Sequence, residues 1–138
     1  MAIPAEKRKY SFLDYLSWDE SDRAELLDGE LIMMTPPARI HQEISVELTR
    51  QLANFLEGKR RRVYHAPFAV RLFEQDGDTP EDVKTVVEPD ISVVCDSGKL
   101  DGRGCKGAPD MVMEILSPST QRHVIKFRIY LTSCQDGH

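Results

Sequence analysis

Two short apolar runs, each holding one carboxylate, constrain the fold of this chain more than any other feature. Asp90 lies in Val87–Val94 and Glu114 lies in Pro109–Leu116. Val, Ile and Met runs of this length, bounded by Pro, Gly and Asp, predict short buried strands. A buried carboxylate is costly unless a cation or hydrogen bonds compensate it. Two such acids on neighbouring strands can share Mg²⁺, which takes one or two carboxylates plus substrate phosphate.

Each acid also has a simpler interpretation when it is considered alone. Asp90 follows a proline and could cap a turn, and Glu114 could point into solvent from an edge strand. Neither residue therefore predicts a metal site by itself. It is the pair, on two predicted strands, that favours one.

The composition limits the class of protein. The chain has 138 residues with 41% hydrophobic and 30% charged side chains, which is typical of one soluble domain with a core. No apolar run approaches the roughly 18 residues of a membrane span, and the N-terminal residues lack the apolar stretch of a secretory signal. The net charge of −5 argues against a protein that coats nucleic acid through bulk charge. An enzyme with a locally basic cleft remains compatible with it.

The cysteines give no sign of a metal cage. There are three, Cys95, Cys105 and Cys134, and no C-x-x-C pair occurs. The spacing predicts neither a zinc site nor a disulfide framework, so we expect a reducing, cytoplasmic setting.

The order of predicted elements favours a single α/β or α+β domain over residues 1–138, with a mixed sheet flanked by helices. The Asp28-Gly29 pair between apolar residues predicts an N-terminal hairpin. Apolar residues every four positions from Ile40 predict an amphipathic helix of about 18 residues. The other expected elements are a helix at 12–18, strands within 62–73, a strand from 86 that continues past Pro89 to 94, a surface connection at 96–109, a strand at 111–116, and a helix from 119 to about 131.

Several polar residues outside the two acids are further candidates. Glu30 follows the predicted turn and could be a metal or water ligand, or only an exposed strand end. His41 opens the long helix and could touch the site or a phosphate, or only cap the helix. Arg60, Arg61 and Arg62 are the best phosphate contacts on charge, although positive charge also suits a helix C-terminus.

Three strings of this sequence resemble one family. They are Glu25-Leu26-Leu27-Asp28-Gly29-Glu30-Leu31, Pro89-Asp90-Ile91-Ser92-Val93-Val94, and Gly107-Ala108-Pro109-Asp110-Met111-Val112-Met113-Glu114-Ile115-Leu116-Ser117-Pro118-Ser119-Thr120. The family is the putative restriction endonuclease family, long catalogued as a domain of unknown function and abundant in cyanobacteria. It belongs to the PD-(D/E)XK nuclease superfamily. The resemblance runs from about Tyr10 to Tyr130.

The resemblance implies a restriction-endonuclease-like core and a Mg²⁺-dependent endonuclease, with Mn²⁺ as a possible substitute. Asp90 matches the first acid of the superfamily and Glu114 the second. The usual lysine position, two residues later, holds Leu116, and the matching lysine from the following helix is Lys126. A solvated helix lysine is the alternative for Lys126. The implied substrate is nucleic acid, most often DNA, and the implied assembly is a homodimer.

This chain also departs from the family pattern. The residues Gln121–Ile125 lead to Lys126 without the expected acid, as though two residues were missing, and the last eight residues lack strand character. We therefore expect a domain truncated at its C-terminus and impaired as a nuclease. The alternative function is a catalytically silent module of the same fold that binds nucleic acid or dimerises.

Overall fold

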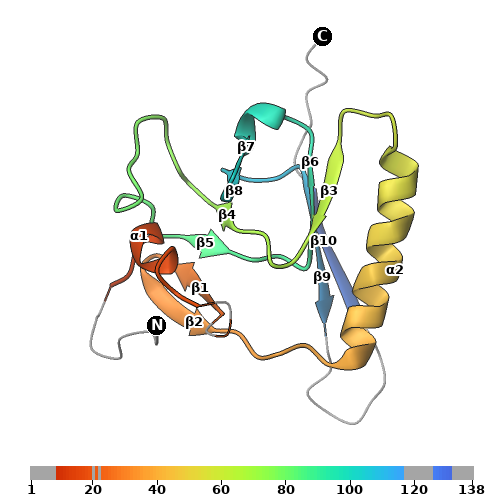
Figure 1. Ribbon diagram of the computed structural model, residues 1–138, viewed down its shortest axis with the longest axis horizontal. Coiled ribbons are helices and arrows are strands. Elements are labelled where there is room, and N and C mark those ends of the chain that lie inside the picture. Colours follow the sequence, from red (N-terminus) through yellow and green to blue (C-terminus); the bar gives the residue numbers. More distant parts are fainter. Residues whose placement is uncertain (1–8, 20, 22, 117–125, 132–138) are drawn as a thin grey trace.

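The computed structural model describes residues 9–19, 21, 23–116 and 126–131, the last of these as backbone only (Figure 1). Its elements, in chain order, are α1 (Phe12–Tyr15), β1 (Ala24–Leu27), β2 (Glu30–Met33), α2 (Arg39–Leu56), β3 (Arg62–His65), β4 (Val70–Arg71), β5 (Val86–Val87), β6 (Ile91–Val94), the 3₁₀ turn η1 (Ser97–Lys99), β7 (Leu100–Asp101), β8 (Gly104–Lys106), β9 (Met111–Leu116) and β10 (Lys126–Leu131).

The strands form two sheets. The first has the order β2-β1-β5-β4-β8-β7, and it is mixed because β4 and β8 run parallel while its other neighbours are antiparallel. The second has the order β10-β9-β6-β3 and is antiparallel throughout. Helix α2 lies along β3 in the second sheet, as Figure 1 shows. The predicted α+β class with a mixed sheet is confirmed.

The hairpin forms where the Asp-Gly pair predicts it. Asp28 and Gly29 both have positive φ, 49° and 80°, as a two-residue turn that matches the strand twist requires. The pairing then runs from Leu27 with Glu30 to Ala24 with Met33. A single dipeptide thus sets the register of β1 and β2.

Helix α2 also follows its sequence pattern, with 18 residues. Ile44, Leu48 and Leu52 are half-buried and Leu56 is buried, so one side of the helix faces β3. The helix ends before Gly58, whose φ of 76° is the left-handed conformation that glycine adopts at no steric cost. The length and direction of α2 bring its two ends to opposite ends of the second sheet.

Two buried clusters hold the molecule together. One packs α1 on the first sheet and consists of Tyr10, Phe12, Leu26, Ala69, Val83 and Val86. The other consists of Val70, Val94 and Cys105. Because Val94 belongs to the second sheet and the other two to the first, this cluster joins the sheets.

Four expectations are wrong. Helix α1 stops at Tyr15 rather than Trp18. The predicted strand across Pro89 is two strands, β5 and β6, in different sheets. The connection at 96–109 contains η1, β7 and β8. Residues 126–131 form β10, antiparallel to β9, where a helix was expected, while 117–125 lie outside the described residues.

The two cysteines of the described residues differ in state. Cys105 is a buried free thiol, whereas Cys95 is disulfide-bonded, which the cysteine spacing gave no reason to expect. Among the residues described, we find no helix with the length and apolarity needed to span a membrane.

Candidate active site

Asp90 lies in the short connection between β5 and β6, and its backbone and side chain are both held. The Ala66 N–H donates to the Asp90 carbonyl at 2.9 Å. The Ile115 N–H donates to Asp90 Oδ2 at 2.7 Å. Pairing of β6 with β9 stops at Ile91, so the Asp90 carboxylate supplies the acceptor that this N–H needs. The acid is therefore fixed against the backbone of β9.

His41, in the first turn of α2, reaches the same carboxylate. Its Nε2 is 3.2 Å from Asp90 Oδ1, and the two side chains are only 15% and 17% exposed. The structure thus brings together two residues that the sequence proposed separately, one as a metal ligand and the other as a contact to nucleic acid.

Glu114 lies in β9 next to this pair. The last β6–β9 pair is Ile91 with Met113, and one residue further along are Asp90 and Glu114. The hydrogen bond from Ile115 to Asp90 places the Asp90 carboxylate against the peptide that links Glu114 to Ile115. Asp90 and Glu114 are consequently opposite each other where the pairing of β6 with β9 ends.

The donor chemistry of these acids fits a hard cation. Carboxylate oxygens are what Mg²⁺ and Mn²⁺ prefer, and Mg²⁺ needs only one or two from the protein when substrate phosphate completes its shell. Within the described part of the chain, no cluster of three or more His, Cys, Asp or Glu side chains is arranged as a metal cage.

Lys126 is the first residue of β10, so the expected helix placement is wrong. The β9–β10 register pairs its Cα with that of Leu116. Leu116 is the position two residues after Glu114, where the resemblance would have placed a lysine. Strand pairing therefore places the Lys126 backbone next to the position where the superfamily has its lysine, although the sequence predicted a helix there.

The other candidates lie elsewhere. Glu30 is exposed at the start of β2, the outer strand of the first sheet, whereas Asp90 adjoins the second. Arg62 opens β3 and pairs with Val94, at the opposite end of β6 from Asp90. That separation is about 13 Å along an extended strand. Arg60 and Arg61 precede it in the turn after α2, so the basic run is not part of the acid cluster.

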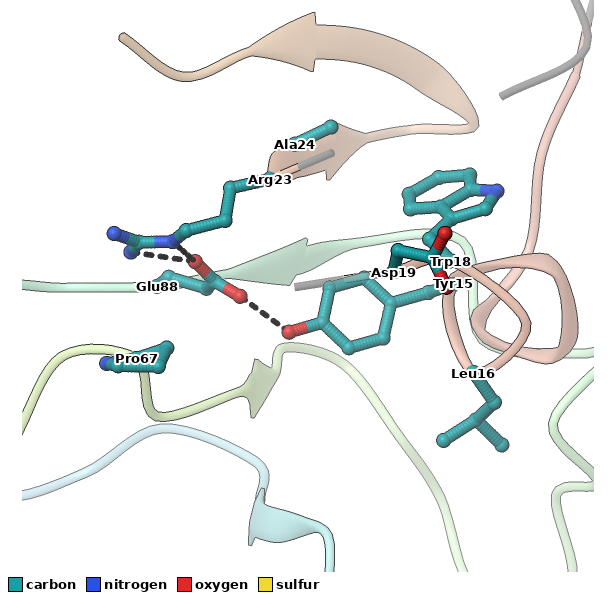
Figure 2. Close-up of a pocket in the computed structure, with 8 residues that line it drawn as sticks. All are labelled: Tyr15, Leu16, Trp18, Asp19, Arg23, Ala24, Pro67 and Glu88. Atoms are coloured by element: carbon teal, nitrogen blue, oxygen red, sulfur yellow. Dashed lines mark hydrogen bonds and ion pairs between the residues drawn. The ribbon is translucent and has the colours of Figure 1, made fainter. Parts of the chain in front are cut away.

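Sequence reasoning missed a buried charged group, Glu88, which is two positions before Asp90 in the chain (Figure 2). The Glu88 side chain is 4% exposed, and its Oε2 accepts from Arg23 Nε at 3.0 Å and Nη2 at 2.8 Å. Its Oε1 accepts a short hydrogen bond from the Tyr15 hydroxyl. Its backbone N–H donates to Glu25 Oε2 at 2.7 Å.

These bonds have an electrostatic consequence. Burial of Tyr15, reinforced by the bond to Glu88, raises the pKa of the Tyr15 hydroxyl well above its ordinary value. The phenol therefore remains a donor at neutral pH. Glu88 stood in the same string as Asp90, but nothing local indicated its partners, which lie 65 and 73 positions earlier.

The chain is similar to known proteins in sequence and in fold. A family model described as "Putative restriction endonuclease" (Uma2) matches residues 12–135. An uncharacterized protein of Synechocystis is 30% identical over 126 residues, which are 88% of this chain and 62% of that protein. The crystal structure of "a putative nuclease belonging to DUF820" from Anabaena variabilis shares the fold. Its TM-score is 0.59 at 20% identity, over 82% of this chain and 62% of that one. The chain thus spans about 62% of the length of both.

Proposed function

Because the chain belongs to the Uma2 family of putative restriction endonucleases, we propose that it is a metal-dependent endonuclease that hydrolyses phosphodiester bonds in nucleic acid, with DNA as the substrate. The observation that carries the proposal is the placement of Asp90. Its carboxylate is hydrogen-bonded to the Ile115 N–H, beside Glu114, and is paired with His41.

Asp90 and Glu114 would hold Mg²⁺, or Mn²⁺ in its place. When bound, the ion neutralises charge on the phosphate and lowers the pKa of a bound water. The Ile115 N–H and the His41 imidazole keep the Asp90 carboxylate in one orientation. Orientation of a ligating acid by such partners commonly changes metal affinity or activity by about 10–100-fold.

Lys126 is the proposed cationic residue of the site. Its Cα is paired with that of Leu116 across β9 and β10, two residues from Glu114. A cation at this position would stabilise the negative charge that develops on the phosphate. The strand register supports this role in place of the helix that the family resemblance implied.

Arg60, Arg61 and Arg62 would contact phosphates away from the reacting one. The distance of Arg62 from Asp90 along β6, about 13 Å, corresponds to roughly four nucleotides at 3.4 Å each along a strand. Such contacts position a strand without reading its sequence. His41 would act through Asp90 instead.

We further propose a homodimer through the hairpin. Strand β2 is one of the two edge strands of its sheet, and Ile32 and Met33 on it are 46% and 56% exposed. An edge strand with exposed apolar side chains can pair with a second copy across a two-fold axis. Light scattering should give about twice 15.7 kDa, and a mass near 15.7 kDa at micromolar concentration would contradict the dimer.

Plasmid cleavage tests the nuclease proposal. Supercoiled DNA incubated with the 138-residue chain should be nicked with Mg²⁺ or Mn²⁺ and left intact with chelator. Glu114→Gln should abolish cleavage, while Glu43→Gln, on the exposed side of α2, should not. Plasmid that stays intact with both metals would contradict the proposal and favour a silent nucleic-acid-binding module.

A further inference from the structure

A cavity of about 640 Å³ lies between α1 and the connection that leads into β6, where Glu88 is two positions before Asp90 (Figure 2). Sites for small ligands usually have volumes between about 300 and 1,000 Å³. The cavity is lined by Tyr15, Leu16, Trp18, Arg23, Pro67 and Glu88, among others. Aromatic and aliphatic surfaces therefore meet one buried ion pair.

The two aromatic rings of α1 and the following turn form one wall. The Tyr15 and Trp18 rings meet edge to face, with centroids 5.7 Å apart. Trp18 is only half-buried, so part of the indole remains open to a ligand. A flat ring is the ligand that such a surface holds best, because stacking on an aromatic side chain contributes to binding for every base.

The charges in the cavity disfavour an anion. The guanidinium of Arg23 is neutralised by Glu88, which accepts two of its N–H groups. A phosphate group would therefore gain little from the one arginine that lines the cavity, so a neutral ring is the better fit.

The same ion pair leaves donors for a polar ring edge. Glu88 engages Nε and Nη2 of Arg23, and the hydrogen bonds found for Arg23 among the described residues do not use Nη1. A guanidinium N–H pair can donate to the carbonyl and ring-nitrogen acceptors of a nucleobase. The ion pair with Glu88 thereby holds the planar guanidinium of Arg23 in one orientation at the cavity.

The cavity is close to the acids along two chain segments. Glu88 is two residues before Asp90, roughly 7 Å in an extended chain. Pro67 follows Ala66, whose N–H holds the Asp90 carbonyl. Stacked nucleotides rise about 3.4 Å each, so a ligand in the cavity would lie roughly two nucleotides from a phosphate at Asp90.

From these observations we infer that the cavity binds an unpaired nucleobase of the strand being cut, stacked on Trp18, with its edge against Tyr15, and hydrogen-bonded by Arg23. The inference rests on the proposed nuclease function and adds a preference for single-stranded or flipped-out bases. Base-paired DNA would have to release a base to fill the cavity, which costs the pairing and stacking of that base.

Binding without catalysis tests the inference. Trp18 is the only tryptophan of the chain, so its fluorescence reports on the cavity directly. We would titrate the chain, in chelator, with a single-stranded deoxyribonucleotide hexamer and with an abasic hexamer that has the same phosphates. The normal hexamer should quench Trp18 and bind about fivefold or more tightly than the abasic one. Equal binding of the two hexamers would overturn the inference.

Variants confirm where the base lies. Trp18→Ala should abolish the preference for the normal hexamer, measured by anisotropy of a labelled strand. Trp18→Phe keeps a ring and should retain it, which covers the case that Trp18→Ala does not fold. Leu13→Ala is the matched control, since Leu13 is 47% exposed on α1, five positions before Trp18, and does not line the cavity. A loss in Leu13→Ala equal to that in Trp18→Ala would overturn the inference.

The two proposals fail separately. Plasmid cleavage with Mg²⁺ together with equal binding of the two hexamers would leave the nuclease and remove the base pocket. Base-dependent quenching of Trp18 without cleavage by either metal would do the opposite.

Discussion

His41 Nε2 lies 3.2 Å from Asp90 Oδ1, so the first turn of α2 is tied to the start of β6. Both side chains are largely shielded from solvent, which strengthens an interaction between a carboxylate and an imidazole. The contact holds the acid that the family resemblance identifies as a metal ligand.

Removing the imidazole should weaken the metal site without unfolding the chain. We expect His41→Ala to raise the Mg²⁺ concentration for half-maximal plasmid cleavage by about 10-fold or more. His65→Ala is the control, because the exposed His65 ring contacts only the neighbouring Ala66 carbonyl among the bonds found for it. Unchanged Mg²⁺ dependence in His41→Ala would show that the contact does not position the acid.

Neutralising Asp90 should remove metal binding. Asparagine keeps an oxygen that can accept from the Ile115 N–H, so we expect Asp90→Asn to melt close to the wild-type temperature while cleavage falls more than about 100-fold. Calorimetry with Mg²⁺ should detect no binding. Asp96→Asn, which alters only a cap that accepts from Gly98, should bind as the wild type does. Unaltered Mg²⁺ affinity in Asp90→Asn means that Asp90 is not a ligand.

The strand register makes a specific prediction about the lysine. Lys126→Ala should lower cleavage by about 100-fold, as removal of one transition-state donor does. Because Leu116 and Lys126 are paired, Leu116→Lys in the Lys126→Ala background should restore part of the activity. Leu131→Lys, at the far end of the same ladder, should restore none. Equal cleavage by wild type and Lys126→Ala would exclude the lysine from the reaction.

The buried ion pair should matter for stability. Arg23→Ala leaves the Glu88 carboxylate buried with one compensating partner fewer, so the free energy of unfolding should fall by about 3 kcal/mol. Arg50→Ala removes an exposed ion pair with Glu47 and should leave the free energy almost unchanged. Urea titrations of the two variants decide the matter, and similar midpoints for both would contradict the prediction.

The Tyr15 hydroxyl predicts a loss of stability in alkali. Because the folded chain raises the Tyr15 pKa, the contribution of this hydroxyl is complete below the unfolded-state pKa of about 10. It is lost as the pH rises from there towards the folded-state pKa. Wild type should therefore be more stable than Tyr15→Phe at neutral pH, and the difference should shrink above about pH 10. Tyr64→Phe, where the ring stacks on Phe68, is the control. A difference that stays constant with pH would be evidence against the bond to Glu88.

Short sequence patterns predicted the hairpin and the long helix correctly. The Asp28-Gly29 pair identified the turn between β1 and β2, and apolar residues at every fourth position identified α2. The family resemblance is confirmed, and with it the α+β class. The site required more than this. His41 and Asp90 meet only because α2 lies along β3, and no local pattern encodes that packing.

The errors also have physical causes. Ser117-Pro118-Ser119-Thr120 is a cap signature, and it outweighed the alternation of Phe127, Ile129 and Leu131, which is typical of a strand. Pairing with β9 favours the alternation. Across Pro89 the apolar residues continue, so the sequence did not reveal that the chain changes sheets there. The roles of Glu30 and of the three arginines remain predictions.

That change of sheets has a consequence for how such a chain can evolve. Val87 is the last residue in one sheet and Ile91 the first in the other, with Asp90 directly before it. The position of the acids depends on β6 and β9, whereas the walls of the cavity come largely from α1 and the segment that follows it. Substitutions in α1 and the segment after it can therefore reshape the cavity while the β6–β9 pairing that sets Asp90 opposite Glu114 stays unchanged.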